Sequence, residues 1–592
     1  MSIVPLVKVT LYGPSAEKDE VLDGLQQLGC LHLNDLRSGV PASANVAAPN
    51  ADARAALQYL QDSPVRRHPS TLEAGADFQA LVKEALDVRD RTRKLDEERE
   101  QLHKWIDELE PWGDFELPTW AQEGPLRFWF YVVPHHQMPR VQATTLLWMV
   151  AARDHRFAYV VIVAADQPAD MPVAPITVDP RSLSKLQARL VQVERELEEL
   201  DYGRIGLTLY TETLREALDE ADDRAARERA GLATLEQSQV FAVQGWAPLA
   251  RSAALRQFAT DRKLALTIEP PGPHDTPPTL LDNPPALRGG EGMVTFYEIP
   301  GYSTWDPSLT VFLCFTIFFA MILSDAGYGL LLGLIVLATW KRTRGSGLRG
   351  VLVALAIASI LYGILVGTYF GLTPPAGSWL AALHVLDAEN QTLMMWIAIG
   401  IGVAQVGYAN LLTAWQRRNS LTTLSSLGWT CMILGGFCGV LGKTNGLAYL
   451  FNAGVAAFGL GGLLVLVFSS ERAFGLMPRL LFGRLTDGLK QFTELSKAFG
   501  DVLSYLRLFA LGLAAIKLGQ VFNNLAASAF SFKGIWVLIG ILVLLIGHSI
   551  NFAMGIMSGV VHGLRLNVIE FFNWSLHEEG ERFEAFAKKA RS

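Results

Sequence analysis

Two arginines that lie in long apolar stretches are the residues of this chain best placed to do chemistry. Arg507 stands among leucines in Asp501–Ala514, which opens an apolar run long enough to span a bilayer. Arg565 stands in the next apolar segment, within His562–Glu570. An arginine at the centre of a membrane helix costs roughly 2.5–3.5 kcal/mol, and a guanidinium cannot avoid this cost by losing its proton. Two fixed cations in neighbouring membrane helices therefore indicate a functional site.

Polar side chains recur around both arginines. In the last apolar segment they step by three and four residues and share one helical face. This face carries His548, Asn551, Gly555, Ser558, His562 and Arg565, and Glu570 and Asn573 follow it. The preceding segment carries Glu494, Asp501, Ser504 and Arg507 in one half and Lys517, Gln520, Asn523 and Asn524 in the other. Lipid offers such groups no partner, so we expect them to face a bundle interior or a wet cavity.

Each cation has a second interpretation. Arg565 lies near the end of a long helix, where its side chain could reach the membrane surface. Lys517 fits a functional position and a surface position equally well. Arg507 could form an internal salt bridge, but its place inside an uninterrupted apolar helix favours function.

About eight apolar segments could hold these residues in a membrane. They cover residues 308–325, 328–341, 350–371, 391–415, 421–441, 448–469, 498–527 and 534–576. The second is short if it begins after Asp325–Gly329, so the first two are expected to form a tight hairpin. Basic residues follow the second, fourth and sixth segments, which predicts that those loops and both chain ends are cytoplasmic.

The 592-residue chain divides into a charged half that Pro and Gly interrupt, residues 1–300, and an apolar half, residues 301–592. Its net charge of −7 is spread along the chain, so no basic surface of the kind that binds nucleic acid is expected. The first residues show no secretory signal, and the four cysteines lack metal-binding spacing. We therefore expect a cytoplasmic first half, with no metal site and no cofactor.

The fold is predicted to be mainly α-helical with small α+β lobes. Alternating or apolar runs predict strands at residues 7–12, 30–33, 128–133, 158–163 and 240–246. Heptad stripes predict long helices at about 78–110 and 182–232. Because a compact insert separates them, their apolar seams are expected to bury each other as an antiparallel coiled coil with globular ends, some 75 Å long. The alternative is an ordinary globular domain that contains both helices.

The tripeptide Gly442-Lys443-Thr444 is similar to the end of a P-loop. Phe437 occupies the position of the required glycine, however, and no strand precedes it. No other nucleotide site is visible, so the chain is not expected to hydrolyse ATP or to carry catalytic residues of its own.

At these residues the chain resembles a known family, the a/I subunit of the rotary V-type and A-type ATPases, over nearly its whole length. Ser504–Ala514 resembles the family helix with the essential arginine, and His562–Glu570 resembles its second arginine helix. Asp325–Gly329 is similar to the turn after the first membrane helix. Weaker likenesses follow the family order at residues 25–32, 244–248, 283–284 and 305–307.

The resemblance implies a multi-pass stator subunit in a prokaryotic inner membrane. Its cytoplasmic arm would bind peripheral stalk subunits of the E/G type, with a central-stalk socket subunit as a further partner. Its last two helices would cup a ring of proteolipid c subunits within the membrane lipid. Arg507 and Arg565 would then serve ion translocation. The half-channel candidates are Glu494, Asp501, Ser504, Ser558, His562 and Glu570, with Asn523, Asn524, His548 and Asn551 assigned loosely to the non-cytoplasmic side.

Two positions depart from the family pattern. Ala515 and Gly555 stand where some members have a histidine and an acidic residue. These departures leave the non-cytoplasmic half-channel without the groups that those members use, so its residues are taken from the polar pattern of this chain.

Elementary electrostatics supports the role that the resemblance implies. A ring carboxylate must be neutral to face lipid and charged to exchange its ion. A fixed cation about 4 Å away, at an effective dielectric near 20, favours the charged form by roughly 4 kcal/mol. Arg507 would force ion release and oppose a direct leak. Whether H⁺ or Na⁺ moves stays open. A secondary transporter would show inverted repeats, which are not visible, and a scaffold with structural ion pairs is the other alternative.

Overall fold

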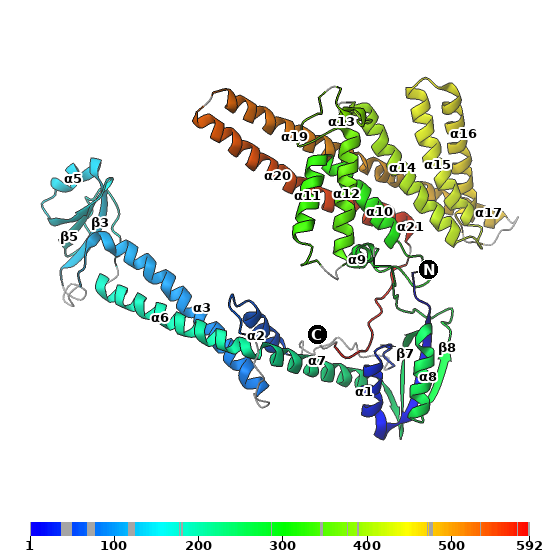
Figure 1. The fold of residues 1–592 in the computed structure, drawn as a ribbon, viewed down its shortest axis with the longest axis horizontal. Helices are drawn as coiled ribbons and strands as arrows, with labels where there is room; N and C mark the ends of the chain where they lie inside the picture. The colour runs from blue at the N-terminus through cyan, green and yellow to red at the C-terminus, as the bar shows by residue number, and fades with distance from the viewer. Residues whose placement is uncertain are drawn as a thin grey trace. The chain divides into compact units, whose positions relative to one another are not determined.

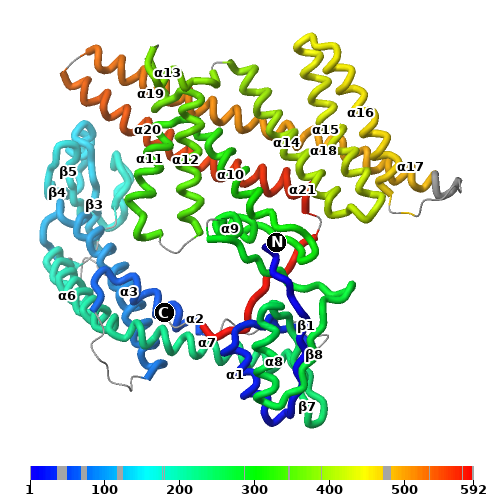
Figure 2. The backbone as a smooth tube through the Cα atoms, turned by 45° about the vertical axis from the view of Figure 1, so that its right-hand side comes forward, coloured from blue at the N-terminus to red at the C-terminus, as the bar shows by residue number. Residues whose placement is uncertain are grey.

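The computed structural model describes residues 2–36, 50–67, 77–116, 125–176, 178, 181–285, 287–343, 347–375, 377–387, 390–470, 472, 478–532, 534–576 and 578–589. The chain is mainly helical, with two small sheets (Figure 1). It forms two compact units. The first comprises Met1–Gly13, Cys30–Asn34 and Ala242–Ala585, and the second comprises Pro14–Gly29, Asp35–Phe241 and Phe586–Ser592. Both can be followed along the backbone in Figure 2.

The first unit begins with an antiparallel sheet. Four of its five strands are β1 (Leu6–Pro14), β2 (His32–Leu33), β7 (Val240–Pro248) and β8 (Ala265–Glu269), in the order β2-β7-β1-β8, and the fifth, β6 (Leu235–Gln237), pairs with β7 outside this order. Lys8 pairs with Glu269, and His32 pairs with Trp246. The predicted strands at 7–12, 30–33 and 240–246 are confirmed. Sequence reasoning missed β8, which is short and lies before a proline-rich stretch.

The second unit contains the long helices of the first half. Its helices are α1 (Lys18–Leu28), α2 (Ala51–Gln61), α3 (Phe78–Leu109), α5 (Met138–Gln142), α6 (Leu183–Leu207) and α7 (Thr211–Ala233). A three-stranded sheet of β3 (Arg127–Pro134), β5 (Phe157–Ala164) and β4 (Leu147–Arg153) lies in the insert between α3 and α6. The predicted strands at 128–133 and 158–163 are therefore confirmed, and β4 was missed.

Helices α3 and α6 pack side by side through their apolar seams (Figure 1). Leu102 and Leu109 of α3 share a buried cluster with Leu186 and Val193 of α6. Arg189 Nε on α6 lies 2.8 Å from Glu98 Oε1 on α3. A short 3₁₀ turn then separates α6 from α7. The apolar stripes that predicted long helices are thus the surfaces by which these helices meet.

A buried carboxylate, Asp222 on α7, connects α7 to α2 and to the end of the chain. Arg54 on α2 donates two hydrogen bonds to it, and Lys589 donates another. Burial raises the pKa of the Asp222 carboxyl, but these hydrogen bonds and charges outweigh burial and hold it below its usual value. The stability that Asp222 contributes is therefore present above its unfolded-state pKa and is lost as the pH falls through the lowered folded-state pKa.

The second half of the chain is a bundle of apolar helices in the first unit. They are α10 (Ser308–Leu323), α11 (Ala326–Ala338), α12 (Leu348–Val366), α14 (Gln391–Gln416), α15 (Thr423–Thr444), α16 (Ala448–Phe468), α17 (Pro478–Phe492), α18 (Leu495–Ser504), α19 (Leu506–Ser531), α20 (Ile535–Arg565) and α21 (Phe572–Ser575), with α9 (Arg288–Tyr297) and α13 (Trp379–Ala382) as shorter neighbours. Helix α8 (Ser252–Asp261) instead packs beside strand β8 of the sheet (Figure 1).

Among the described residues, six helical stretches are long and apolar enough to cross a membrane. They are α12, α14, α15, α16, the stretch Phe482–Ser531 and the stretch Ile535–Ser575. The other two predicted segments correspond to α10 and α11, which are apolar but only 16 and 13 residues long. Length and composition thus support six of the eight predicted spans.

Candidate functional site

Close packing around α20 brings the polar residues of several helices together. Three of its glycines face side chains of α10. A Cβ at Gly559 would lie 2.6 Å from the Phe319 ring, one at Gly555 would lie 2.8 Å from Leu323, and one at Gly563 would lie 3.3 Å from the Phe315 ring. A Cβ at Gly547 would lie 2.3 Å from the Phe522 ring of α19. Small residues at these positions let membrane helices approach closely, so α20 lies against both α10 and α19.

The first group of polar residues is an arginine cluster, which we define as Arg507, Arg565 and Glu570. Arg507 Nη1 lies 3.8 Å from Glu570 Oε1, and Arg565 Nε lies 3.9 Å from the same oxygen. Only 3% of the Glu570 side chain is exposed, compared with 24% for Arg507 and 52% for Arg565. Two cations from different helices therefore face one buried carboxylate.

The arginine cluster contains unmet hydrogen-bonding groups. Arg507 Nη1 and Glu570 Oε2 are buried without a hydrogen-bond partner among the described residues, as is the Nδ1 atom of nearby His562. The two distances to Glu570 exceed hydrogen-bond length. With Glu570 ionised, the cluster carries a net formal charge of +1. Arg507 is therefore near an acid of its own chain but is not locked against it.

A π-helical turn, Leu566–Phe571, explains how Glu570 reaches Arg565. Residues five apart on an α-helix are separated by about 140° around the axis, at 100° per residue. A π-helix pairs residues i and i+5, so it carries Glu570 round toward the face of Arg565. π-turns inside α-helices are frequent at functional sites. The sequence pattern placed Glu570 after the polar face and gave no sign of this turn.

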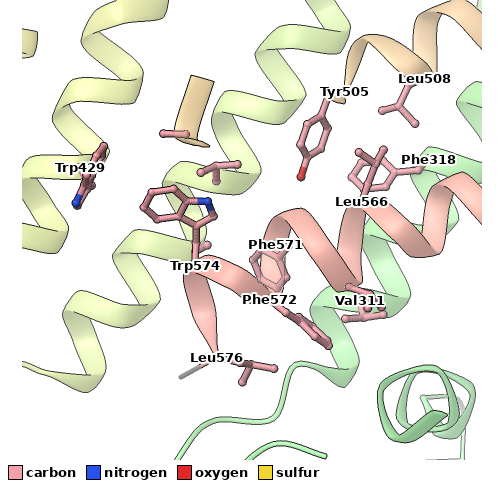
Figure 3. Packing of buried hydrophobic residues seen from close by; sticks show 14 of the residues in the cluster. Val311, Phe318, Trp429, Tyr505, Leu508, Leu566, Phe571, Phe572, Trp574 and Leu576 are labelled. Atoms are coloured by element: carbon pink, nitrogen blue, oxygen red, sulfur yellow. The ribbon is translucent and has the colours of Figure 1, made fainter. Parts of the chain in front are cut away.

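A series of buried hydrogen bonds connects the helical segment that carries Arg507 to the segment that carries Glu570. The Tyr505 hydroxyl donates to Gln405 Oε1 (2.7 Å), and Gln405 Nε2 donates to Asn567 Oδ1 (3.0 Å). Tyr505 lies two residues before Arg507, and Asn567 lies three residues before Glu570. Figure 3 shows Tyr505 packed close to the helix that carries Leu566 and Phe571.

The second group is a histidine network, which we define as Tyr328, Asn523, His548 and Asn551. His548 Nδ1 lies 2.7 Å from the Tyr328 hydroxyl, and His548 Nε2 lies 3.0 Å from Asn523 Oδ1. Asn551 Nδ2 donates to the Tyr328 hydroxyl (3.0 Å) and to the Ala515 carbonyl (2.9 Å). Three helices, α11, α19 and α20, thus meet in one hydrogen-bonded set.

The directions of these hydrogen bonds are mutually consistent for one form of His548. An amide oxygen accepts, so Nε2–H must donate to Asn523. A neutral imidazole then leaves Nδ1 as an acceptor for the Tyr328 O–H, whose oxygen accepts from Asn551. Protonation of Nδ1 would turn this acceptor into a donor and break the bond from Tyr328. The network therefore fits neutral His548 with its proton on Nε2.

Asp325 anchors the histidine network to the backbone. It caps α11 by accepting from the Tyr328 N–H, and it also accepts from the N–H groups of Phe370 (2.9 Å) and Gly371 (2.8 Å). The Phe370 carbonyl in turn accepts from Asn523 Nδ2 (2.7 Å). Phe370 and Gly371 both have positive φ angles, 51° and 72°, so this turn presents its N–H groups to one carboxylate.

Other predicted site residues lie outside both groups. Asp501 accepts from the indole N–H of Trp574 at 2.7 Å. Glu494 lies 3.9 Å from Lys497, with its side chain 44% exposed. The Ser504 hydroxyl donates to the Gly500 carbonyl. Ser558 and His562 are half-buried on α20, and Asn524 is exposed.

Sequence reasoning missed three members of these arrangements. Tyr328 was noted only as part of a turn, and Gln405 and Asn567 were not singled out. A polar side chain inside an apolar helix was the available signal for Gln405 and Asn567, as it was for Asn551. Tyr328 gave no such signal, because tyrosine is common in apolar helices.

Comparison with known proteins gives consistent matches. No family model matches the chain. The chain is 26% identical over 608 residues to the V-type ATP synthase subunit I of Chlamydia pneumoniae, covering 90% of this chain and 88% of that protein. It is 23% identical over 599 residues to V-type ATP synthase subunit I of Borreliella burgdorferi, covering 96% and 97%.

An archaeal relative and one solved structure extend these matches. The A-type ATP synthase subunit I of Archaeoglobus fulgidus is 25% identical over 682 residues, covering 99% of this chain and 98% of that protein. A crystal structure of the cytoplasmic N-terminal domain of subunit I, homolog of subunit a, of V-ATPase aligns with 44% of this chain and 99% of that chain, at 16% identity and a TM-score of 0.24.

Proposed function

Because the chain belongs to the subunit I family of the V-type and A-type ATP synthases, we propose that it is the membrane stator that carries ions past a ring of c subunits. It forms two ion half-channels against that ring and couples the movement of H⁺ or Na⁺ to rotation. Rotation then drives, or is driven by, ATP chemistry at nucleotide sites on other subunits of the complex.

The observation that carries this proposal is the composition of the arginine cluster. Two guanidinium groups share one carboxylate, and Arg507 Nη1 and Glu570 Oε2 have no hydrogen-bond partner among the described residues. A purely structural ion pair of this burial would need complete hydrogen bonding to offset its desolvation. The net formal charge of +1 and the Arg507 donor without a partner fit a carboxylate of another polypeptide that binds and then dissociates.

The two groups of polar residues fit two half-channels. Glu570, His562 and Ser504 would line the path on the side of the arginine cluster, and the histidine network would line the other. Arg507 of the arginine cluster and Asn523 of the histidine network lie on the same helix, α19. An ion that tried to pass directly would meet a permanent positive charge, so the route through the moving ring is favoured.

The first half of the chain fits a stator arm. We propose that residues 1–300 form it, with α3 and the α6–α7 stretch as an antiparallel coiled coil that peripheral stalk subunits bind. Residues 301–592 would form the translocation domain with eight spans, of which α10 and α11 are the short ones. Both chain ends would lie in the cytoplasm of a prokaryotic cell.

The direct test replaces Arg507 with alanine in the assembled complex and measures ATP-driven ion transport in membrane vesicles. Removing a charge aimed at a reacting group typically costs roughly 10²–10³ in rate, so transport should fall at least about a hundredfold. Lys517→Ala is the matched control, because Lys517 is a cation on the same helix whose ammonium donates to Gln520 and forms no ion pair among the described residues. It should retain transport.

Assembly decides between this proposal and a structural scaffold. The amount of c subunit that co-purifies with the Arg507→Ala chain should match the unmodified complex. Loss of the ring from that variant would favour the scaffold, and normal transport in it would refute the ion-path role of Arg507.

A further inference from the structure

An apolar groove lies between helices α14, α15, α16 and α18, and no member of the arginine cluster or the histidine network lines it. Its walls include Trp396, Met432, Phe437, Phe458 and Phe499, and every side chain that lines it is apolar. Its cavity volume is about 290 Å³. Water needs two to four polar partners to occupy a cavity, and the lining side chains contain only the indole N–H of Trp396 as a polar group. The groove therefore suits a hydrocarbon.

The groove continues along α15 toward a lysine. A second hollow, of about 420 Å³, lies on the α15–α16 surface and shares Gly436, Val440 and Phe458 with the first. It ends at Lys443 and Thr444. From Met432 to Lys443 is 443 − 432 = 11 residues, or about 16 Å along a helix. One continuous wall thus leads from an apolar interior to a cation.

Lys443 is a free cation at the end of a membrane-length helix. It lies in the last turn of α15, it is exposed, and no ion pair to it is present among the residues that the structure describes. The neighbouring Thr444 hydroxyl donates to the Leu441 carbonyl instead of pointing to a ligand. Lysines at helix ends reach the membrane surface, where the ammonium can form a charge-assisted hydrogen bond to a lipid phosphate.

We propose that this groove binds one anionic glycerophospholipid, with an acyl chain in the apolar part and the phosphate beside Lys443. A helix of another protein is about 10–12 Å wide with its side chains, which is too wide for the inner cavity, whereas a single acyl chain fits. This inference requires only that α15 and α16 lie in a membrane, and it does not depend on the ion path.

The bound chain would support the helix that leads to the arginine cluster. Phe499 and Val502 of α18 line the groove, and α18 continues through Tyr505 to Arg507. Acyl-chain packing on α18 thus fills a cavity that would otherwise lie beside this helix. The lipid would be a structural component of the stator rather than a member of the bulk bilayer.

Glycines provide a matched pair of variants. A Cβ at Gly436 would meet the Phe458 ring at 3.7 Å, an ordinary contact, so Gly436→Leu places its side chain into the groove without a backbone clash. Gly459 on α16 has nothing within 4 Å of its Cβ position and does not line the groove. Gly459→Leu therefore adds the same side chain to the same helical hairpin outside the proposed site.

The test reconstitutes the whole complex into vesicles of phosphatidylethanolamine and phosphatidylglycerol. A trace of phosphatidylglycerol carries a photoreactive group near the end of one acyl chain, and peptides that it labels are mapped by mass spectrometry. Labelling should concentrate on Met432, Phe499 and Val502. Gly436→Leu should remove most of it, and Gly459→Leu should leave it unchanged. Lys443→Gln should lower it about fivefold, without affecting labelling by a phosphatidylcholine probe.

The same experiment can overturn the proposal. Uniform labelling of all lipid-facing helices would show that the groove holds no particular lipid. Absence of labelling while a cross-link joins the groove to another subunit would show that protein covers it. Equal labelling in Gly436→Leu and the unmodified complex would refute the acyl-chain position, and an unchanged Lys443→Gln variant would refute the headgroup contact.

Discussion

The arginine cluster and the histidine network are built from similar helices but satisfy their polar groups in opposite ways. The arginine cluster holds three charged side chains, and its two ion-pair distances to Glu570 are 3.8 and 3.9 Å. The histidine network holds four neutral side chains that are joined by hydrogen bonds of 2.7–3.0 Å. Among the described residues, one region has polar atoms without hydrogen-bond partners, whereas the hydrogen bonds of the other run in one consistent direction.

This difference indicates different tasks. A buried polar atom without a hydrogen bond costs about 1–3 kcal/mol, and a protein retains it where a ligand or a moving group supplies the partner. A closed network instead fixes the positions of its members and can pass a proton only after a bond is rearranged. Within the proposed function, we therefore propose that the arginine cluster exchanges the ion with the ring and that the histidine network lines the access on the other side.

The largest effect within this comparison is expected at Glu570. In Glu570→Gln the side chain keeps its shape but loses the charge that faces both arginines. We expect ATP-driven transport to fall at least about tenfold, or about 1.4 kcal/mol in the barrier. Proton or sodium uptake into vesicles measures the change.

Glu494→Gln is the control for that experiment. Glu494 is also a glutamate that the sequence pattern predicted for a half-channel, but it lies outside both polar groups, its side chain is 44% exposed and its ion-pair partner is Lys497. Its transport should stay close to that of the unmodified complex. If Glu570→Gln transports at the normal rate, the two arginines do not depend on the charge of Glu570, and the cluster has no special status.

A smaller effect is expected at Tyr328 in the histidine network. Tyr328→Phe removes the hydroxyl that donates to His548 and accepts from Asn551, although Asn551 keeps its bond to the Ala515 carbonyl. The loss of a buried hydrogen bond should lower the free energy of unfolding by about 1–3 kcal/mol. Thermal unfolding of the purified complex, together with a severalfold loss of transport, would show it.

Tyr369 offers a matched control in the adjoining turn. Its hydroxyl is buried without a hydrogen-bond partner among the described residues, so Tyr369→Phe removes the same atom but breaks no bond. Stability should be unchanged or slightly increased. Equal losses in both variants would mean that the tyrosine ring matters rather than the network.

Several features of this region could be predicted from the sequence because local composition determines them. Apolar length predicts helices, and the step of three and four residues placed His548 and Asn551 on one face of α20. The cost of a buried guanidinium singled out Arg507. Each of these arguments needs only residues that are near each other in the chain.

The partners could not be predicted, because they depend on which helices meet. Tyr328 and His548 are separated by 220 residues, and Asp501 and Trp574 by 73 residues. A helical pattern identifies a face but not the helix that this face contacts. The π-turn that carries Glu570 toward Arg565 is also a product of tertiary packing, since nothing in Leu566–Phe571 departs from an ordinary helical sequence.

The smallest loss of transport is expected for a variant of Asp501, and this variant tests the comparison between the two groups most directly. Asp501 is a carboxylate close in sequence to Arg507, but it accepts a hydrogen bond from the Trp574 indole at 2.7 Å and forms no ion pair with an arginine among the described residues. If polar atoms without hydrogen-bond partners mark the residues that take part in ion transport, Asp501→Asn should reduce transport less than about twofold. The reason is that a carboxamide oxygen still accepts from the Trp574 indole. Asp501→Leu loses that bond and should lower stability, which thermal unfolding can measure. A large loss of transport in Asp501→Asn would instead show that charge near Arg507 is what counts, and the path would then extend to Asp501 as the sequence pattern predicts.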